Sequence, residues 1–199
     1  MFTLPKTLLA ATLVLCALTS AAQTTRIRGT IESAESNVVT VKLQDGTRSK
    51  LVLPANVTIV AVVKASMSDI KEGTYIGSAA RPLPDGTQRA LEVHIFPEEM
   101  RGTGEGHRPY SLPQSTMTNG ATTGAAVKGV EGSTITIKYT GGEKKIVVPP
   151  DTPIVRYVLG TTGDLKPGAH FTVTSATRQP DGSYEASRIN VGRGSTIPR

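Results

Sequence analysis

Apolar and polar residues alternate along several short stretches of the chain, and the first of these stretches is Arg26–Ile31. A period of two is typical of a β-strand with one buried face. The alternation returns at Val39–Leu43. The Asp45-Gly46 pair that follows favours a hairpin, because a type I′ turn needs positive φ at both central positions. Further strands are predicted at residues 51–53, 75–80 and 90–96, whereas residues 59–63 form a short apolar run. The pattern therefore predicts an all-β protein.

The same pattern occurs twice. Lys145–Val155 repeats Lys50–Val60 at an offset of 95 residues, and Asp164–Gly168 repeats Asp69–Gly73 at the same offset. In the first copy, Ser68–Gly73 is typical of one capped helical turn that ends at a glycine. The start of the second copy is predicted where Val127-Lys-Gly129 matches Ile27-Arg-Gly29, so the chain contains two copies of one small β-rich unit.

Each copy contains five predicted strands with one short helical turn between strands 3 and 4. That order is typical of a small barrel like the oligonucleotide/oligosaccharide-binding (OB) fold, which closes most strand edges. We therefore expect two tandem five-stranded OB-like barrels at residues 23–96 and 126–199, following an N-terminal signal peptide. A sandwich-like pair of sheets is the alternative. With three Phe, five Tyr and no Trp in 199 residues, both cores must consist mainly of Val, Ile and Leu.

Residues 1–22 have the features of a secretory signal peptide. Lys6 supplies a positive charge, Leu8–Leu18 is an apolar run too short to span a bilayer, and Ser20-Ala21-Ala22 offers a cleavage site before Gln23. A retained membrane anchor is one alternative. Lipidation at Cys16 is another, although Leu15 stands where a lipoprotein precursor needs a small residue. The sequence therefore predicts a periplasmic or secreted protein.

Cleavage would change two properties of the chain. It removes the one cysteine, which excludes disulfides, thiol catalysis and thiolate metal sites from the mature protein. It also removes Lys6 and no acidic residue, so the net charge of +6 becomes +5. This mild positive charge fits either a solvated surface or contact with anionic envelope polymers and lipids.

The turn and strand motifs resemble a known group of proteins. Arg28-Gly-Thr-Ile31, the Asp-Gly hairpin, the repeated Asp-(Ile/Leu)-Lys-x-Gly and the Pro-Asp-Gly strand pair are similar to exported bacterial OB-like β-barrel domains of unknown function. The resemblance covers residues 26–192, and some relatives bear the label of a metal-transporter component. The resemblance implies a fold but no mechanism. A permease would need several transmembrane helices, which this sequence does not offer.

A glycine-rich inter-repeat loop is predicted at residues 97–125. Long ordered loops are often functional, whereas disordered ones are spacers. Spacing or packing between the barrels is the simpler interpretation, yet charged and aromatic residues are concentrated here beyond what a spacer needs. If the loop binds a partner, the first residues to test are Arg101, Glu105, His107, Arg108 and Tyr110.

Metal binding is the second hypothesis for this segment. Imidazole and carboxylate groups suit a divalent cation, and the candidates are His94, Glu98, Glu99 and His107. Their spacing matches no established zinc pattern. His94 stands opposite the apolar face of its predicted strand, so we expect it to be exposed. His170 aligns with Tyr75, which argues against a ligand role shared by the two repeats.

Other functions are disfavoured by the sequence. It contains no nucleophile elbow and no phosphate loop, and Glu98 and Glu99 are adjacent in an extended chain rather than paired as in a glycosidase. The scarcity of aromatic residues argues against binding of nucleic acids and of oligosaccharides, both of which commonly use aromatic platforms. The predicted export also argues against nucleic-acid binding. We expect no cofactor and no transmembrane helix in the mature chain. The expected function is non-catalytic binding of a protein or cell-envelope component; the alternative is a divalent-metal- or small-ligand-binding accessory of a transport system.

Overall fold

The computed structural model describes residues 24–130 and 132–198, so the predicted signal peptide lies outside the described residues. The all-β prediction is confirmed. The strands are β1 (Thr24–Glu35), β2 (Val38–Leu43), β3 (Arg48–Val52), β4 (Thr58–Lys64), β5 (Tyr75–Pro82), β6 (Gln88–Ile95), β7 (Gly106–Pro109), β8 (Thr116–Gly129), β9 (Gly132–Tyr139), β10 (Gly142–Val148), β11 (Ile154–Leu159), β12 (His170–Arg178), β13 (Tyr184–Glu185) and β14 (Arg188–Gly192). Three 3₁₀ turns complete the fold: η1 (Met67–Asp69), η2 (Glu98–Met100) and η3 (Thr162–Asp164). Among the described residues, no helix has the length and apolar character needed to cross a bilayer.

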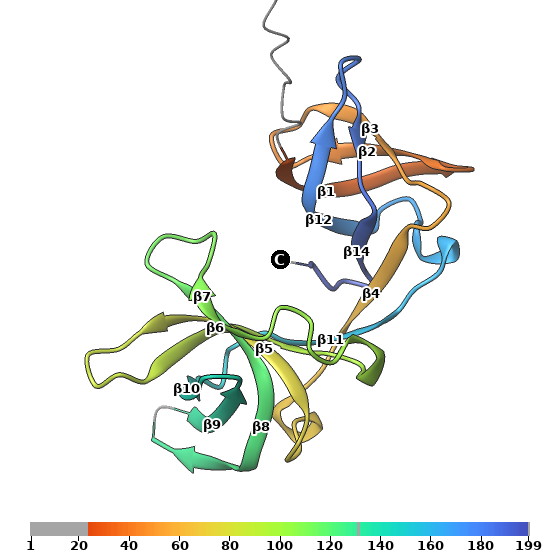
Figure 1. Cartoon of the computed structure of the whole chain (residues 1–199). Coiled ribbons are helices and arrows are strands. Elements are labelled where there is room, and N and C mark those ends of the chain that lie inside the picture. The colour runs from red at the N-terminus through yellow and green to blue at the C-terminus, as the bar shows by residue number, and fades with distance from the viewer. Residues whose placement is uncertain (1–23, 131, 199) are drawn as a thin grey trace, which may run out of the picture.

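Hydrogen-bonded strand pairs close two five-stranded barrels, which lie in the upper and lower parts of Figure 1. The first barrel runs β1-β2-β3-β13-β12 and closes through the β12–β1 pair. The second barrel runs β5-β6-β10-β9-β8 and closes through the β8–β5 pair. The expected five-stranded barrel is therefore present.

Each barrel takes strands from both repeats. Strands β1–β3 of the first repeat pair with β12 and β13 of the second, and β8–β10 of the second repeat pair with β5 and β6 of the first. The prediction of one barrel per repeat, at 23–96 and 126–199, is corrected by this exchange. Local patterns specify each strand but not the copy with which it pairs, so the sequence repeat alone could not show the exchange.

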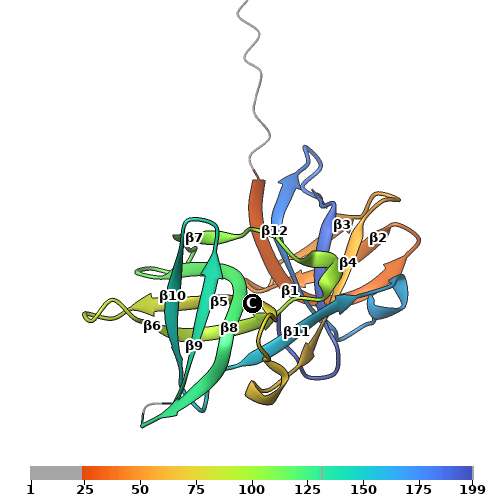
Figure 2. The ribbon, with the colours of Figure 1, turned by 60° about the horizontal axis from the view of Figure 1, so that its bottom comes forward.

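Strands β4 and β11 cross between the barrels and join them into one continuous sheet (Figure 2). They pair antiparallel, with Val62 opposite Tyr157, which is its equivalent 95 residues later. Strand β4 also pairs in parallel with β14, and β11 with β6, in matching registers. An approximate twofold axis therefore passes between Val62 and Tyr157 and relates the two halves of the chain.

These crossing strands account for a second correction. The apolar run at 59–63 is the main part of β4, so the helical turn follows the fourth strand rather than the third. The first repeat has six strands, β1–β6, and in the second the counterpart of β6 is divided into β13 and β14. Residues Ile59–Val62 are all buried. A strand covered on both faces lacks the polar alternation by which the other strands were recognised.

Aliphatic side chains fill both barrels, as the scarcity of aromatic residues predicted. The first core surrounds Phe171 with Ile31, Val41, Leu51 and Ile189. The second core is built around Ile76, Ile137 and Ile146. A third buried cluster lies along the crossing strands; it comprises Val60, Val62, Tyr75, Phe96, Met100, Val155 and Tyr157.

The start of the second repeat lies earlier than predicted. Gly29 pairs with Phe171 in the first barrel, and Gly120 pairs with Ile76, the equivalent of Phe171, in the second. A Cβ atom would meet the Lys42 carbonyl oxygen at 2.0 Å from Gly29, and the Lys138 carbonyl oxygen at 2.2 Å from Gly120. Gly120, not Gly129, is thus the counterpart of Gly29. Most of the expected loop at 97–125 is structured as η2, β7 and the first part of β8.

The repeated turns have the predicted capping role. The Asp69 carboxylate accepts a hydrogen bond from the Ser66 backbone N–H at 2.8 Å, and Asp164 accepts the equivalent bond from Thr161 at 2.9 Å. Gly73 and Gly168 follow with φ of 78° and 83°. Such φ values are unfavourable for residues with a Cβ, so these glycines serve turn geometry.

Candidate anion-binding cleft

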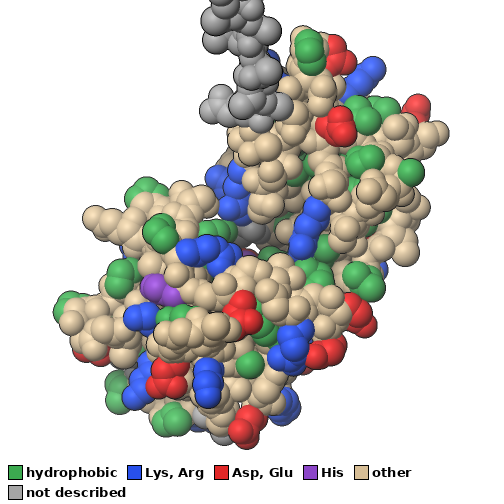
Figure 3. Space-filling model, viewed as in Figure 1, with side chains coloured by type: hydrophobic (Ala, Val, Ile, Leu, Met, Phe, Trp, Pro, Cys, Tyr) green, Lys and Arg blue, Asp and Glu red, His purple; other side chains and the backbone are tan. Residues whose placement is uncertain are grey.

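A cleft of about 860 Å³ lies between the first barrel, the segment that follows β7 and the C-terminal residues. Figure 3 shows a hollow between the two lobes of the molecule, with Lys and Arg side chains gathered at its margin. Its polar lining residues are Arg26, Arg28, Thr30, Lys42, Gln44, Ser111 and His170; its larger apolar lining residues are Leu43, Tyr110, Leu112, Phe171, Ile197 and Pro198. The volume lies within the range of small-ligand sites in proteins.

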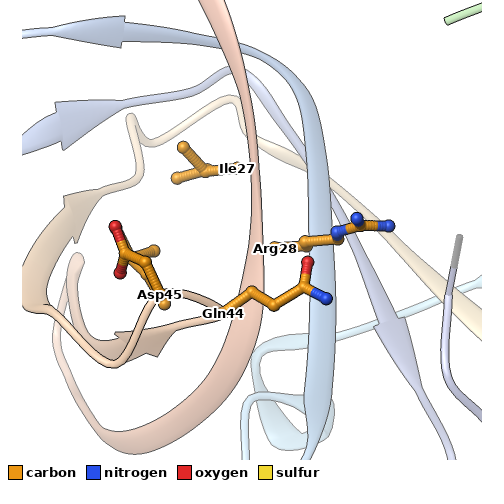
Figure 4. A pocket seen from close by; sticks show the side chains of 5 residues that line it. Ile27, Arg28, Gln44 and Asp45 are labelled. Carbon is orange, nitrogen blue, oxygen red and sulfur yellow. The ribbon is translucent and has the colours of Figure 1, made fainter.

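Strand β1 supplies one wall of this cleft through its outward-facing residues. Successive side chains of a strand point to opposite faces, so Arg26, Arg28 and Thr30 share the face opposite Ile27. Figure 4 shows an adjacent smaller pocket that shares Arg28, Leu43 and Gln44 with the cleft; there Arg28 and Gln44 extend to one side of β1, while Ile27 and Asp45 lie on the other. The alternation that buries the barrel core therefore also directs two guanidinium groups into the cleft.

Arg26 connects the first barrel to the segment after β7. Its Nη1 donates hydrogen bonds to the Tyr110 hydroxyl at 3.2 Å and to Ser111 Oγ at 3.0 Å, and its guanidinium lies 5.8 Å from the centre of the Tyr110 ring. Its Nε is buried and has no hydrogen-bond partner. A buried donor without a partner is costly, so the bonds of Nη1 to Tyr110 and Ser111 are made at the expense of Nε.

Cationic side chains predominate in the cleft. Arg26, Arg28 and Lys42 line it together with His170, and among the lining residues that the structure describes none is Asp or Glu. His170 Nδ1 lies 3.4 Å from Thr30 Oγ1, which leaves Nε2 as its other polar atom. Several cations without a lining carboxylate favour an anionic group in the cleft.

The equivalent surface of the second barrel is covered by the chain itself. The registers relate Arg28 to Asn119, His170 to Tyr75 and Gln44 to Thr140. We name residues 101–107 the cover segment because they lie across these three positions. The Thr103 carbonyl oxygen accepts hydrogen bonds from Asn119 Nδ2 at 2.9 Å and from the Tyr75 hydroxyl at 3.3 Å.

Two further contacts fasten the cover segment. Glu105 accepts hydrogen bonds from the backbone N–H of Thr140 at 2.7 Å and from its hydroxyl at 2.9 Å. These bonds, the backbone one foremost, lower the pKa of the Glu105 carboxyl. His107 donates to or accepts from Thr118 Oγ1 at 2.8 Å and stacks at 6.5 Å on Tyr139.

The candidate interaction residues therefore separate into two groups. Arg101 binds Glu98 and the Gly73 carbonyl oxygen, and Arg108 donates to the Gly104 carbonyl oxygen at 2.6 Å. Arg101, Glu105 and His107 thus hold the chain against the second barrel, whereas Arg108 bonds to the cover segment itself. Tyr110 alone reaches the cleft of the first barrel.

The candidate metal ligands are not brought together. Among the described residues there is no cluster of three or more His, Cys, Asp or Glu that could hold a metal ion. Glu98 pairs with Arg101, and His107 contacts Thr118. His94 is 5% exposed rather than exposed as predicted, because the crossing strands cover what sequence reasoning took for an outer face.

His94 belongs instead to a buried polar group beside the crossing strands. Its Nε2 lies 2.5 Å from the Glu92 carboxylate, and its ring stacks on Tyr157 at 5.2 Å. Burial, with a contribution from Glu92, raises the pKa of the Tyr157 hydroxyl. Both members of the His94–Glu92 pair are buried, so the pair serves packing at the junction of the barrels.

Comparison with known proteins adds no further assignment. No protein-family model, curated protein or solved structure matches this chain. The resemblance to exported OB-like domains accordingly stays a prediction. Sequence reasoning missed the cleft because β1, the β2 end, Tyr110 and His170 are far apart along the chain; the alternation of Arg26 and Arg28 was the one local signal.

Proposed function

We propose that this chain is a non-catalytic binding protein whose ligand places an anionic group in the cleft of the first barrel. The observation that carries the proposal is the convergence of Arg26, Arg28, Lys42 and His170 on a cleft in which no described lining residue is Asp or Glu. A catalytic histidine would need an orienting partner and a nucleophile, whereas His170 has Thr30 as its polar neighbour.

The ligand belongs to a protein or another component of the cell envelope, in line with the predicted export of the chain. That location rests on residues 1–22, and mass spectrometry of the exported protein should give an N-terminus at Gln23. A mass that includes residues 1–22 would contradict it. The small-ligand alternative is favoured by the size of the cleft, while a metal-binding role has no ligand cluster among the described residues.

Anion binding is tested by the effect of small anions on stability. Glutarate and phosphate, compared with chloride at constant ionic strength, should raise the melting temperature in a saturable manner, since a ligand of the native state stabilises it. The double variant Arg28→Gln/Lys42→Gln should lose this response. Arg178→Gln/Lys50→Gln is the matched control, because it removes two exposed charges of the same barrel that do not line the cleft. An equal response in both double variants would overturn the proposal.

A further inference from the structure

The cover segment shows what kind of ligand this type of surface accepts. It is short, and Gly102, Gly104 and Gly106 all have positive φ, so its backbone lies close to the barrel with few side chains between. Its principal bonds use one backbone carbonyl, that of Thr103, and one carboxylate, that of Glu105. The second barrel therefore binds a glycine-rich segment of its own chain through one peptide oxygen and one carboxylate, although the segment as a whole has no net charge, since Arg101 balances Glu105.

The first barrel offers a comparable but more basic set of donors. Where Asn119 and the Tyr75 hydroxyl hold a carbonyl oxygen, the first barrel has Arg28 and His170, whose side chains can also donate to an oxygen. Arg28 adds a full positive charge that Asn119 lacks. The change preserves a site for peptide oxygens and strengthens the preference for a carboxylate.

The path of the C-terminal residues reinforces the comparison. The Thr196 N–H donates to the Arg193 carbonyl oxygen at 3.3 Å, as the Met100 N–H does to Pro97 at 3.0 Å, so residues 193–196 repeat the turn that precedes the cover segment. Thr172 Oγ1 then donates to the Pro198 carbonyl oxygen at 2.8 Å. The cleft lies next to this point, in the position that corresponds to the cover segment.

Exposed apolar side chains lie at the same place. Leu112 is 46% exposed and Ile197 is 58% exposed, and both line the cleft. Large apolar residues left accessible beside a polar site are typical of surfaces that bind a partner. They provide contacts for an apolar side chain next to the acidic group.

We propose that the cleft of the first barrel binds an extended acidic peptide segment of a partner protein, seated as the cover segment is seated on the second barrel. This inference rests on the proposed function, since it specifies the ligand of the same cleft. Arg28 and His170 hold peptide oxygens, Arg26 and Lys42 complement the acidic side chains, and Leu112 and Ile197 contact a neighbouring apolar residue.

The test uses calorimetric or NMR titration of the purified protein with three probes. They are the peptide acetyl-Gly-Thr-Gly-Glu-Leu-Glu-Gly-amide, its analogue with Gln in place of both Glu, and free glutarate. We expect the acidic peptide to bind about tenfold or more tightly than the Gln analogue, as loss of a charge-assisted hydrogen bond predicts, and also more tightly than glutarate.

Two pairs of variants locate the binding. Arg28→Gln should weaken binding of the acidic peptide about tenfold, whereas Arg178→Gln should leave its affinity unchanged. Leu112→Ser should weaken it by a smaller factor, whereas Leu159→Ser, which changes an exposed leucine outside the cleft, should have no effect. Circular dichroism verifies that all four variants are folded.

The contrary outcomes are distinguishable. If glutarate binds in the cleft as tightly as the peptide, the anion site stands and the peptide inference fails. If the protein dimerises through the cleft and excludes the peptide, the occupant is a second copy and the inference also fails. If no probe binds, the inference and the proposed function fail together.

Discussion

The two barrels differ at one equivalent surface. In the second barrel, Asn119, Tyr75 and Thr140 bind residues 101–107 of the chain itself. In the first barrel, the corresponding Arg28, His170 and Gln44 line an open cleft. The two barrels thus share their strand registers, while at this surface the neutral Asn119 of the second barrel corresponds to the cationic Arg28 of the first. The comparison distinguishes the residues that maintain the barrel fold from the surface residues that are available to bind a ligand.

The largest expected effect comes from the glycines that define this correspondence. Gly29→Ala and Gly120→Ala would each place a Cβ against a carbonyl oxygen of the neighbouring strand, and each should destabilise the protein by about 3 kcal/mol or more. Gly129→Ala is the control, because its nearest contact would be 3.4 Å away. Urea denaturation measures the stability of all three variants. An equal loss of stability in Gly120→Ala and Gly129→Ala would contradict the assignment of Gly120 as the counterpart of Gly29.

A smaller effect is expected where the cover segment is anchored. Met100 is buried beside Tyr75 and Phe96, so Met100→Ala should cost about 2 to 3 kcal/mol of stability by leaving a cavity. Hydrogen exchange should show faster opening of residues 101–107, while anion binding in the cleft of the first barrel is retained. Loss of that binding would show that the two surfaces are not independent.

The equivalent turns η1 and η3 can be compared through the pH dependence of stability. Arg193 donates to the Asp164 carboxylate at 2.7 and 3.0 Å and is the main cause of its lowered pKa. A carboxyl whose pKa is lowered in the folded state stabilises it above the unfolded value of 3.8, and this contribution is lost as the pH falls through the folded pKa. Asp164→Asn should therefore cost about 1 to 2 kcal/mol at pH 7 and progressively less below pH 4.

Asp69→Asn is the equivalent substitution in the first half of the chain, 95 residues before Asp164. Asp69 caps its turn in the same way and pairs with Arg156, but its side chain is 36% exposed against 12% for Asp164. Water screens the more exposed pair, so Asp69→Asn should cost less. Denaturation curves at pH 3 and pH 7 measure both variants; a cost for Asp164→Asn that is the same at the two pH values would refute the ion-pair explanation.

The smallest expected effect concerns His107, which packs on the second barrel. Burial, and then the nearby Lys144, lower its pKa below 6.5. NMR titration should give a pKa for His107 below 6.5, and Lys144→Gln should raise this pKa slightly. Lys145→Gln is the matched control, because neighbouring strand residues face opposite ways. An unchanged pKa of His107 in Lys144→Gln would mean that burial alone lowers this pKa.

The sequence was informative wherever structure is local. Alternation at Arg26–Ile31 and Val39–Leu43 and the capping aspartates predicted elements that are present. The hairpin at Asp45-Gly46 is also present, but the type I′ turn is wrong, because of these two residues only Gly46 has a positive φ, of 87°. It was uninformative about pairing between the repeats, because either copy of a strand satisfies the same hydrophobic pattern. The exchange is revealed by the strand pairings themselves, such as β1 with β12 and β5 with β8.

The same limit applies to the candidate site. Residues 97–125 are rich in polar groups, yet three of the five chosen residues, Arg101, Glu105 and His107, hold the chain to the second barrel, and Arg108 bonds to the cover segment. Arg26 and Arg28 were visible only as the polar half of an alternating strand. His170 is brought next to β1 by the β1–β12 pair that closes the first barrel, and Tyr110 by the segment that follows β7; no local pattern encodes either contact.

Amide NMR of the ¹⁵N-labelled protein during titration with glutarate tests the central claim most directly. Saturable shifts should concentrate at Thr30, Lys42, Ser111 and His170, around the cleft of the first barrel, and should disappear in Arg28→Gln/Lys42→Gln. The equivalent residues of the second barrel, Tyr75, Asn119 and Thr140, should not respond. Shifts of equal size on both barrels, or none at the cleft, would contradict the account.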